Sequence, residues 1–280
     1  MASRVLYASS PDWGVRGGRL DELVANPDFR VLKKTSRTLA GIAQVDGVEV
    51  FVKRVASVSW VKGIVARVCG SRARRTIRGA EILQRTGFSH PRLIAALERC
   101  QCGSVRTSYV VVECLHRPKI LSRFALADGR DFRWRRWLSE RLAQTIRSLH
   151  DAGCYTRDLQ ETNLMLEAQG GRLKIYFTDL EDFRQAPRVS RRLRMLNLIH
   201  LDRSIGRFVS RAHRLRFLYN YLGSRPGKVE ARALVAHLHR IRERIERRKR
   251  RQQRTNAIIT PPPHRSQTLR TSGIPLLPSR

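Results

Sequence analysis

The chain has 280 residues, 41% of them hydrophobic, and its 56 lysines and arginines against 23 aspartates and glutamates give a formal net charge of +33. This length allows one large domain or two lobes with a buried core each, so size alone excludes no class of folded enzyme. The charge predicts polyanionic partners, but it cannot rank nucleic acid, nucleotides, phosphorylated sugars and anionic lipid surfaces. The five cysteines include one C-x-C and no metal-like pairs, so we expect reduced thiols without a metal or redox role.

The hydropathy of the chain gives no targeting or spanning segment. The first eleven residues lack the basic start and the long apolar run of a signal peptide, and nowhere do about 18 apolar residues follow one another. We therefore expect a cytoplasmic protein.

The N-terminal part is predicted to consist mainly of strands. Asp46-Gly47 separates two runs of strand-forming residues, which is a strong hairpin signal. A basic stretch at 60–78 leads into a helical pattern that Gly87 and Pro91 end. The expected elements, in chain order, are strands at 31–32, 39–45 and 48–52, a helix around 77–84, and strands at 93–98 and 109–114.

The C-terminal part is predicted to be mostly helical. Apolar residues recur every three or four positions across 131–151, which indicates an amphipathic helix, and 189–222 is a further helical region. A loop and two short strands lie between these helices, the second at 173–178. Residues 184–254 carry 22 lysines and arginines and 4 acids, so 22 − 4 = 18 positive charges lie in that stretch. Residues 251–280 are rich in Pro, Ser, Thr and Arg and are expected to be disordered.

The most informative motif follows the predicted helix at 131–151. Residues 155–166 read Y-T-R-D-L-Q-E-T-N-L-M-L and fit the kinase catalytic loop H-R-D-L-x-x-x-N except at the histidine, which is Thr156 here. Phosphoryl transfer needs a carboxylate near the acceptor hydroxyl and an oxygen ligand for a metal ion on the ATP phosphates. Asp158 is the candidate for the first role and Asn163 for the second. Their alternative interpretation is an ordinary turn.

A second metal ligand is expected where the strand at 173–178 ends. Asp179 stands there, and the local pattern is Asp-Leu-Glu instead of Asp-Phe-Gly. Its assignment therefore rests on its position after an apolar strand.

Three further residues are candidates for ATP binding. Lys53 lies on an apolar strand and is expected to reach the α- and β-phosphates, and Glu81 on the following helix is its candidate partner. Tyr109–Leu115 looks like a hinge strand that holds adenine through backbone groups, with Glu113 in it. The sequence signal for a glycine-rich loop that covers the phosphates is weak, because only Gly41 lies where such a loop is expected.

The order of strand lysine, helix, hinge, R-D-x-x-x-x-N and strand aspartate resembles the protein-kinase-like superfamily. Within it, the chain is similar to the bacterial lipopolysaccharide kinase (Kdo/WaaP) family over residues 30–222. The motifs that carry this likeness are F-V-K-R at 51–54, G-S-R-A-R-R at 70–75, G-F-x-x-P at 87–91, A-A-L-E at 95–98, L-R-x-x-N-L-x-x-L-D-R-S at 193–204 and L-R-F-L-x-x-Y-L at 215–222.

The resemblance implies an α+β, protein-kinase-like two-lobed fold, with an N-lobe at 1–115 and a C-lobe at 116–250. It also implies ATP, Mg²⁺ and a sugar hydroxyl acceptor, Kdo or heptose, on the lipopolysaccharide inner core at the cytoplasmic face of the inner membrane. The segment after Asp179 fits this acceptor, because Ala186-Pro187 follows within seven positions and leaves no room for a peptide-docking loop. In many relatives the helix acid falls nearer Thr76 than Glu81, so the partner of Lys53 is open.

Two other functions stay open from sequence. The same fold can phosphorylate a protein or a small molecule such as an aminoglycoside. A catalytically inactive kinase-like module that binds polyanions at a membrane or on RNA is the alternative outside enzymes, although the base and metal positions are all filled. Nucleic acid is not the partner that we expect, but the charge does not exclude it.

Overall fold

A computed structural model of the chain describes residues 2–16, 19–57, 70–115, 118–125, 132–169, 172–206 and 208–223, and five residues further on. The chain divides into two compact units, Met1–Glu230 and Ala231–Arg280. Every strand and helix named below belongs to the first unit, and the described residues of the second, 236, 240, 243, 244 and 247, are helical. Residues 60–69 of the predicted basic stretch at 60–78 and the predicted tail at 251–280 lie outside the described residues.

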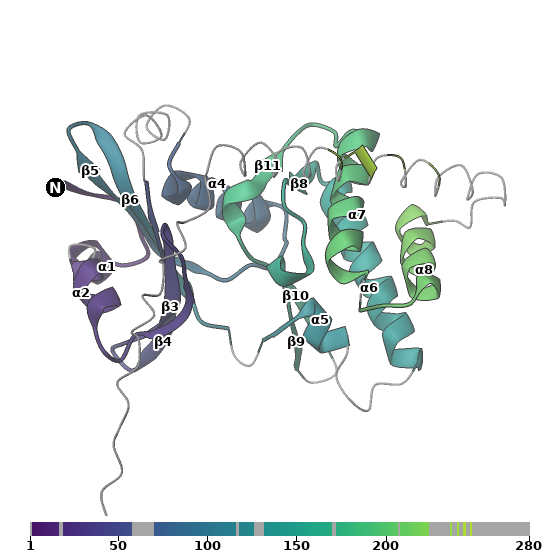
Figure 1. Cartoon of the computed structure of the whole chain (residues 1–280), viewed down its shortest axis with the longest axis horizontal. Coiled ribbons are helices and arrows are strands. Elements are labelled where there is room, and N and C mark those ends of the chain that lie inside the picture. The colour runs from purple at the N-terminus through teal and green to yellow at the C-terminus, as the bar shows by residue number, and fades with distance from the viewer. Residues whose placement is uncertain are drawn as a thin grey trace, which may run out of the picture. The chain divides into compact units, whose positions relative to one another are not determined.

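The N-terminal part forms a six-stranded antiparallel sheet in the order β1-β5-β6-β4-β3-β2. Figure 1 shows this sheet with α1 (Pro11–Arg16) and α2 (Leu20–Ala25) against it. The sequence analysis missed β1 and both short helices. The strands are β1 (Ala2–Ala8), β2 (Arg30–Lys34), β3 (Thr38–Val45), β4 (Val48–Ala56), β5 (Leu93–Gln101) and β6 (Ser104–Glu113).

Two tight turns set the register of this sheet. Asp46 and Gly47 both have positive φ, 51° and 75°, and join β3 to β4 as predicted. Cys102 and Gly103, at 48° and 72°, join β5 to β6 in the same way. Positive φ at both central residues matches the right-handed twist of the strands, so these turns direct each pair into a regular hairpin.

The helix α4 (Arg72–Arg85) follows the sheet strand that carries Lys53. Ser71 caps its first turn by accepting a hydrogen bond from the Arg74 backbone N–H at 3.2 Å, and Gly87 follows its end with φ 76°. Gly79 faces the turn at Leu180 so closely that a Cβ at this position would clash with the Leu180 carbonyl oxygen. Glycine at 79 therefore allows α4 to lie directly on the turn that carries Asp179.

The remaining elements of the first unit are mostly helical and include two small antiparallel sheets, one in the order β10-β9-β7 and one that pairs β11 with β8. The long helix α6 predicted at 131–151 is present, and α8 packs along it. These elements, drawn in teal and green in Figure 1, are β7 (Lys119–Ile120), α5 (Leu121–Ala125), α6 (Phe132–Asp151), β8 (Cys154–Thr156), η2 (Glu161–Asn163), β9 (Leu164–Gln169), β10 (Arg172–Phe177), η3 (Leu180–Asp182), β11 (Phe183–Gln185), α7 (Arg191–Ile205) and α8 (Arg211–Leu222).

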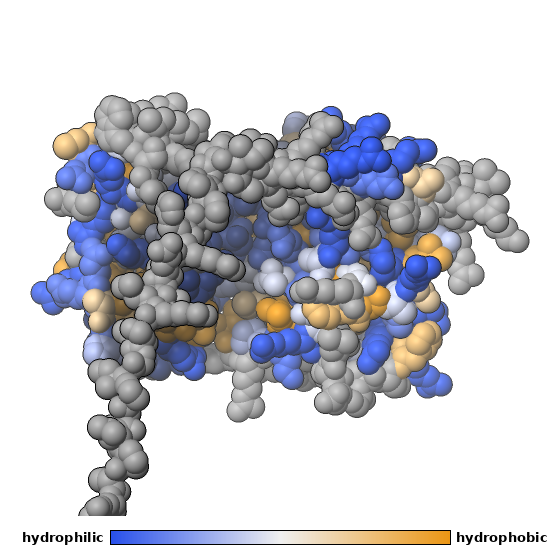
Figure 2. Space-filling view, in the orientation of Figure 1, coloured by the Kyte–Doolittle hydropathy of each residue, from blue (hydrophilic) through white to orange (hydrophobic). Residues whose placement is uncertain are grey.

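The face of the molecule drawn in Figure 2 carries many hydrophilic residues. No described helix has both the length and the apolar character that crossing a bilayer requires.

We expect Gly79→Ala to lower the free energy of unfolding by about 1–3 kcal/mol, because the added methyl group forces α4 away from the Leu180 carbonyl. Urea denaturation followed by circular dichroism measures this change. Gly14→Ala in α1 is the matched control, since a Cβ there meets nothing within 4 Å and alanine favours a helix. Equal unfolding midpoints for Gly79→Ala and the wild type would contradict the contact.

Candidate active site

The predicted catalytic loop lies between β8 and η2. The Asp158 backbone N–H donates to Thr156 Oγ1 at 3.2 Å, and the Gln160 amide donates to one oxygen of the Asp158 carboxylate. Asn163 Nδ2 donates to the Asp158 carbonyl at 3.0 Å. The loop is therefore folded around Asp158, whose side chain stays partly exposed.

Backbone contacts place Asn163 beside the strand that leads to Asp179. The Thr178 N–H donates to the Asn163 carbonyl oxygen at 3.0 Å, and Asp179 follows directly. Since Nδ2 of Asn163 is used within the loop, its Oδ1 is the free end of the amide, and no described residue donates to it. Asp179 itself has left-handed backbone angles, φ 54° and ψ 54°, which aspartate tolerates better than most residues.

Lys53 on β4 reaches this turn from the sheet. Its Nζ lies 2.6 Å from Asp179 Oδ1 and 3.6 Å from Glu181 Oε1. The side chains of Lys53 and Asp179 are 27% and 30% exposed, so the pair is shielded from solvent more than a surface salt bridge is. The structure thus joins two residues that the sequence placed in one site from positions 126 residues apart.

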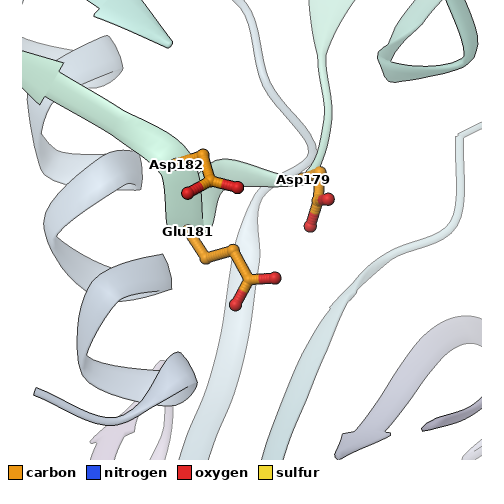
Figure 3. A group of neighbouring side chains, drawn as sticks. All are labelled: Asp179, Glu181 and Asp182. Atoms are coloured by element: carbon orange, nitrogen blue, oxygen red, sulfur yellow. The ribbon is translucent and has the colours of Figure 1, made fainter. Parts of the chain in front are cut away.

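Three carboxylates gather on the turn after β10. Single oxygens of Asp179, Glu181 and Asp182 all lie within 4.8 Å of one another. Figure 3 shows the side chains of Asp179 and Glu181 extending downward from the turn. Glu181 is the most buried of the three and also pairs with two arginines of α4, Arg72 at 2.5 Å and Arg75 at 3.6 Å.

The catalytic loop is supported from behind by a buried polar network. The Asn197 amide on α7 accepts from the Thr156 N–H at 3.3 Å and donates to the Thr156 carbonyl at 2.7 Å. His150 at the end of α6 lies 3.2 Å from Asn197 Oδ1 through Nε2 and 2.8 Å from the Tyr221 hydroxyl of α8 through Nδ1. Three helices thereby fix the backbone of the residue that stands two positions before Asp158.

The expected pair between Lys53 and Glu81 is not formed. Glu81 is exposed on α4, and the partners of Lys53 among the described residues are Asp179 and Glu181. The buried stripe of α4 runs through Ala73, Thr76 and Ala80. Position 81 follows this stripe by about 100° around the helix and so faces solvent.

The proposed hinge and the phosphate-covering loop stay predictions. The Glu113 carboxylate accepts a hydrogen bond from the Arg92 backbone N–H at 2.8 Å, and the Glu113 backbone N–H donates to the Arg92 carbonyl at 3.0 Å. These groups therefore bind the end of β6 to the residue that precedes β5. The turn between β2 and β3 is stabilised by Thr35, whose Oγ1 accepts from the backbone N–H groups of Arg37 and Thr38. Gly41 lies within β3 against Arg30 and does not form this turn.

A lysine from an antiparallel sheet, an aspartate after a strand, and an R-D loop closed by asparagine meet here at one place. This arrangement is that of a phosphotransferase with a protein-kinase-like mixed α/β fold.

Comparison with known proteins gives the family. A family model for the lipopolysaccharide kinase (Kdo/WaaP) family matches residues 64–221, so the chain belongs to this family of kinases that act on the lipopolysaccharide core. Among solved structures it is similar to one titled "WaaP in complex with acyl carrier protein", with a TM-score of 0.63 and 22% identity over 86% of this chain and 98% of that one. At this identity the likeness shows the fold alone. No curated protein matches the chain.

Sequence reasoning missed two groups of residues at this site. The signal for Glu181 was the Asp-Leu-Glu pattern, which has a glutamate where Asp-Phe-Gly has glycine. The signal for the second group was the run of arginines at the start of α4, because cations there oppose the helix dipole and are more stable beside an acid. The network of His150 and Asn197 gave no local signal, because its members come from helices that only the fold brings together.

His150 predicts a loss of stability in acid. Burial lowers the pKa of its imidazole to about 4, from 6.5 in the unfolded chain. Between pH 6.5 and pH 4 the unfolded chain therefore binds a proton that the folded protein does not. The free energy of unfolding is unaffected above pH 6.5 and falls by about 3 kcal/mol in all as the pH decreases to 4. Urea denaturation at pH 7 and pH 4.5 measures this loss. His150→Gln should flatten the difference, and an unchanged difference in that variant would contradict the assignment.

Proposed function

We propose that the protein transfers the γ-phosphate of ATP to a hydroxyl of Kdo or heptose in the lipopolysaccharide inner core. The observation that carries this proposal is the 2.6 Å ion pair between Lys53 and Asp179 beside the catalytic loop. A metal–nucleotide complex needs a cation beside its phosphates and an acid beside its metal ion, and the Lys53 ammonium and the Asp179 carboxylate match these two needs.

The residues fit Mg²⁺. Asp179 offers a carboxylate, and Asn163 offers an amide oxygen to which no described residue donates, and both are hard oxygen ligands of the kind that Mg²⁺ prefers. Held by Asp179 and Asn163, Mg²⁺ would supply the positive charge that offsets the charge of the ATP phosphates. Lys53 would then hold the α- and β-phosphates.

Asp158 is proposed to receive the proton of the acceptor. One of its carboxylate oxygens is occupied by Gln160, which leaves the second to accept from the sugar hydroxyl. The acceptor oxygen then bonds to the γ-phosphorus while the bond from this phosphorus to the β,γ-bridging oxygen breaks and ADP leaves. The loop contacts from Thr156 and Asn163 keep Asp158 in place throughout.

Cations next to Asp158 support an acceptor that carries phosphates. Arg157 is exposed, and burial together with the nearby Arg157 charge lowers the pKa of Arg184. Arg75 and Arg78 lower it further and Asp182 raises it, so the charges of four guanidinium groups act on one another here. Such a cluster suits a phosphorylated inner core.

The wider setting is also a proposal. We propose that residues 1–115 and 116–250 form the two lobes of a kinase, that the backbone around Glu113 holds adenine, and that the basic surface rests on the cytoplasmic face of the inner membrane. The solved relative is in complex with acyl carrier protein, so a protein partner of this kind belongs to the proposal.

Asp158→Asn should abolish phosphoryl transfer while ATP binding is retained, because the amide cannot accept the hydroxyl proton. Transfer from radiolabelled ATP and binding of a fluorescent ATP analogue measure the two steps. Asp12→Asn, an exposed position on α1, is the control and should behave as the wild type. Undiminished transfer by Asp158→Asn would remove this residue from the mechanism.

The acceptor is tested by competition. We expect label from ATP to enter an inner-core glycolipid that contains Kdo and heptose in preference to a protein or an aminoglycoside at equal concentration. Preferential labelling of either of the other two acceptors would overturn the proposed substrate. If no acceptor is labelled and vesicle binding weakens steeply with salt, the protein is a polyanion-binding module instead.

A further inference from the structure

The carboxylate of Glu181 is shared by three cations. Arg72 Nη1 and Lys53 Nζ lie 2.5 Å and 3.6 Å from its Oε1, and Arg75 Nη2 lies 3.6 Å from its Oε2. The Glu181 side chain is 7% exposed, and Oε2 has no hydrogen-bond donor among the described residues. A buried carboxylate needs such opposite charges, since burial alone disfavours its ionised form.

The helix α4 cannot provide an acid for Lys53 from its first turns. Arg72, Arg74 and Arg75 occupy them, and the first turn carries no acid. Cations at a helix N-terminus oppose the helix dipole, so acids from other elements must compensate for them. Glu98 of β5 does this for Arg74 at 3.1 Å, and Glu181 does it for the other two.

We propose that Glu181 is the positioning residue that holds Lys53 in the site and ties it to α4, in place of an acid on the helix. The proposal rests on the function assigned to Lys53 above. Because Asp179 is also needed at the metal, Lys53 requires a second acid when the nucleotide binds. Glu181 remains beside the ammonium and is itself fixed by Arg72 and Arg75.

The same contacts argue against a metal on Glu181. Three cations already lie within 4 Å of its two oxygens, and a divalent ion there would meet their repulsion. Asp179, whose described ion pair is with Lys53 alone, is therefore better placed than Glu181 to turn towards a metal ion.

The test compares the wild type with Lys53→Met, Glu181→Gln and the double variant. We expect Glu181→Gln to raise the KM for ATP and the Kd for trinitrophenyl-ATP about tenfold or more, because a shielded anionic partner of Lys53 is lost. In the Lys53→Met background the same change should add less than about twofold, since Glu181 acts through Lys53. A merely structural residue would instead weaken both backgrounds alike.

Two further variants test whether the effect of Glu181→Gln depends on the position of the acid and on its charge. Glu81→Gln removes the exposed helix acid and should leave KM and kcat unchanged. Glu181→Asp keeps the charge and should retain more ATP affinity than Glu181→Gln. If thermal melting shows that Glu181→Gln does not fold, Arg72→Met tests the same connection at a side chain that is 46% exposed, and a raised KM for ATP is expected there too.

The outcomes distinguish the two proposals. A wild type that binds no trinitrophenyl-ATP overturns the kinase function and this inference with it. If Lys53→Met weakens ATP binding but Glu181→Gln does not, or if the two effects multiply, the inference alone is overturned. A change confined to the Mg²⁺ concentration for half-maximal activity would make Glu181 a metal ligand, which also overturns it.

Discussion

The active site depends on the ion pairs that Lys53 makes across the boundary between the sheet and the turn after β10. The pair with Asp179 joins residues 126 positions apart, and both pairs are partly shielded, so salt screens them less than it screens exposed pairs. Both described ion-pair partners of Lys53 belong to the same four-residue turn, which begins at Asp179. The strand lysine is thereby set relative to the catalytic loop, which shares hydrogen bonds with that turn through Arg157 and Thr178.

A second constraint comes from polar groups that are buried without charge. Thr156 occupies the place where most kinases carry histidine, and its backbone is held by the Asn197 amide instead. Asn197 is in turn oriented by His150, which the protein keeps neutral by burial. A buried network of this kind is favourable only when each member has its partner, so the three helices and the loop must form together.

The sequence was sufficient to predict the elements that depend on neighbouring residues in the chain. Alternating strands, the Asp46-Gly47 turn, the long helix before the loop and the R-D-x-x-x-x-N motif depend on nearby residues, and the structure contains each of them. The partner of Lys53 was not local. It depends on how far α4 is rotated and how closely it approaches the turn, and that is decided by packing at Gly79 against Leu180. The kinase pattern places this acid on the helix, whereas the first turn of α4 carries arginines and no acid.

The relocation of this acid changes how the parts of the site are coupled. An acid on α4 would link Lys53 to the helix without passing through the turn that carries Asp179. In this protein the acid that holds Lys53 is Glu181, two residues after Asp179 on one short turn, and α4 is bound to the same turn through Arg72 and through the backbone contact at Gly79. A shift of α4 must therefore displace Glu181 and Asp179 together. Lys53, Asp179 and α4 thus form one connected unit, joined through Glu181 and Arg72.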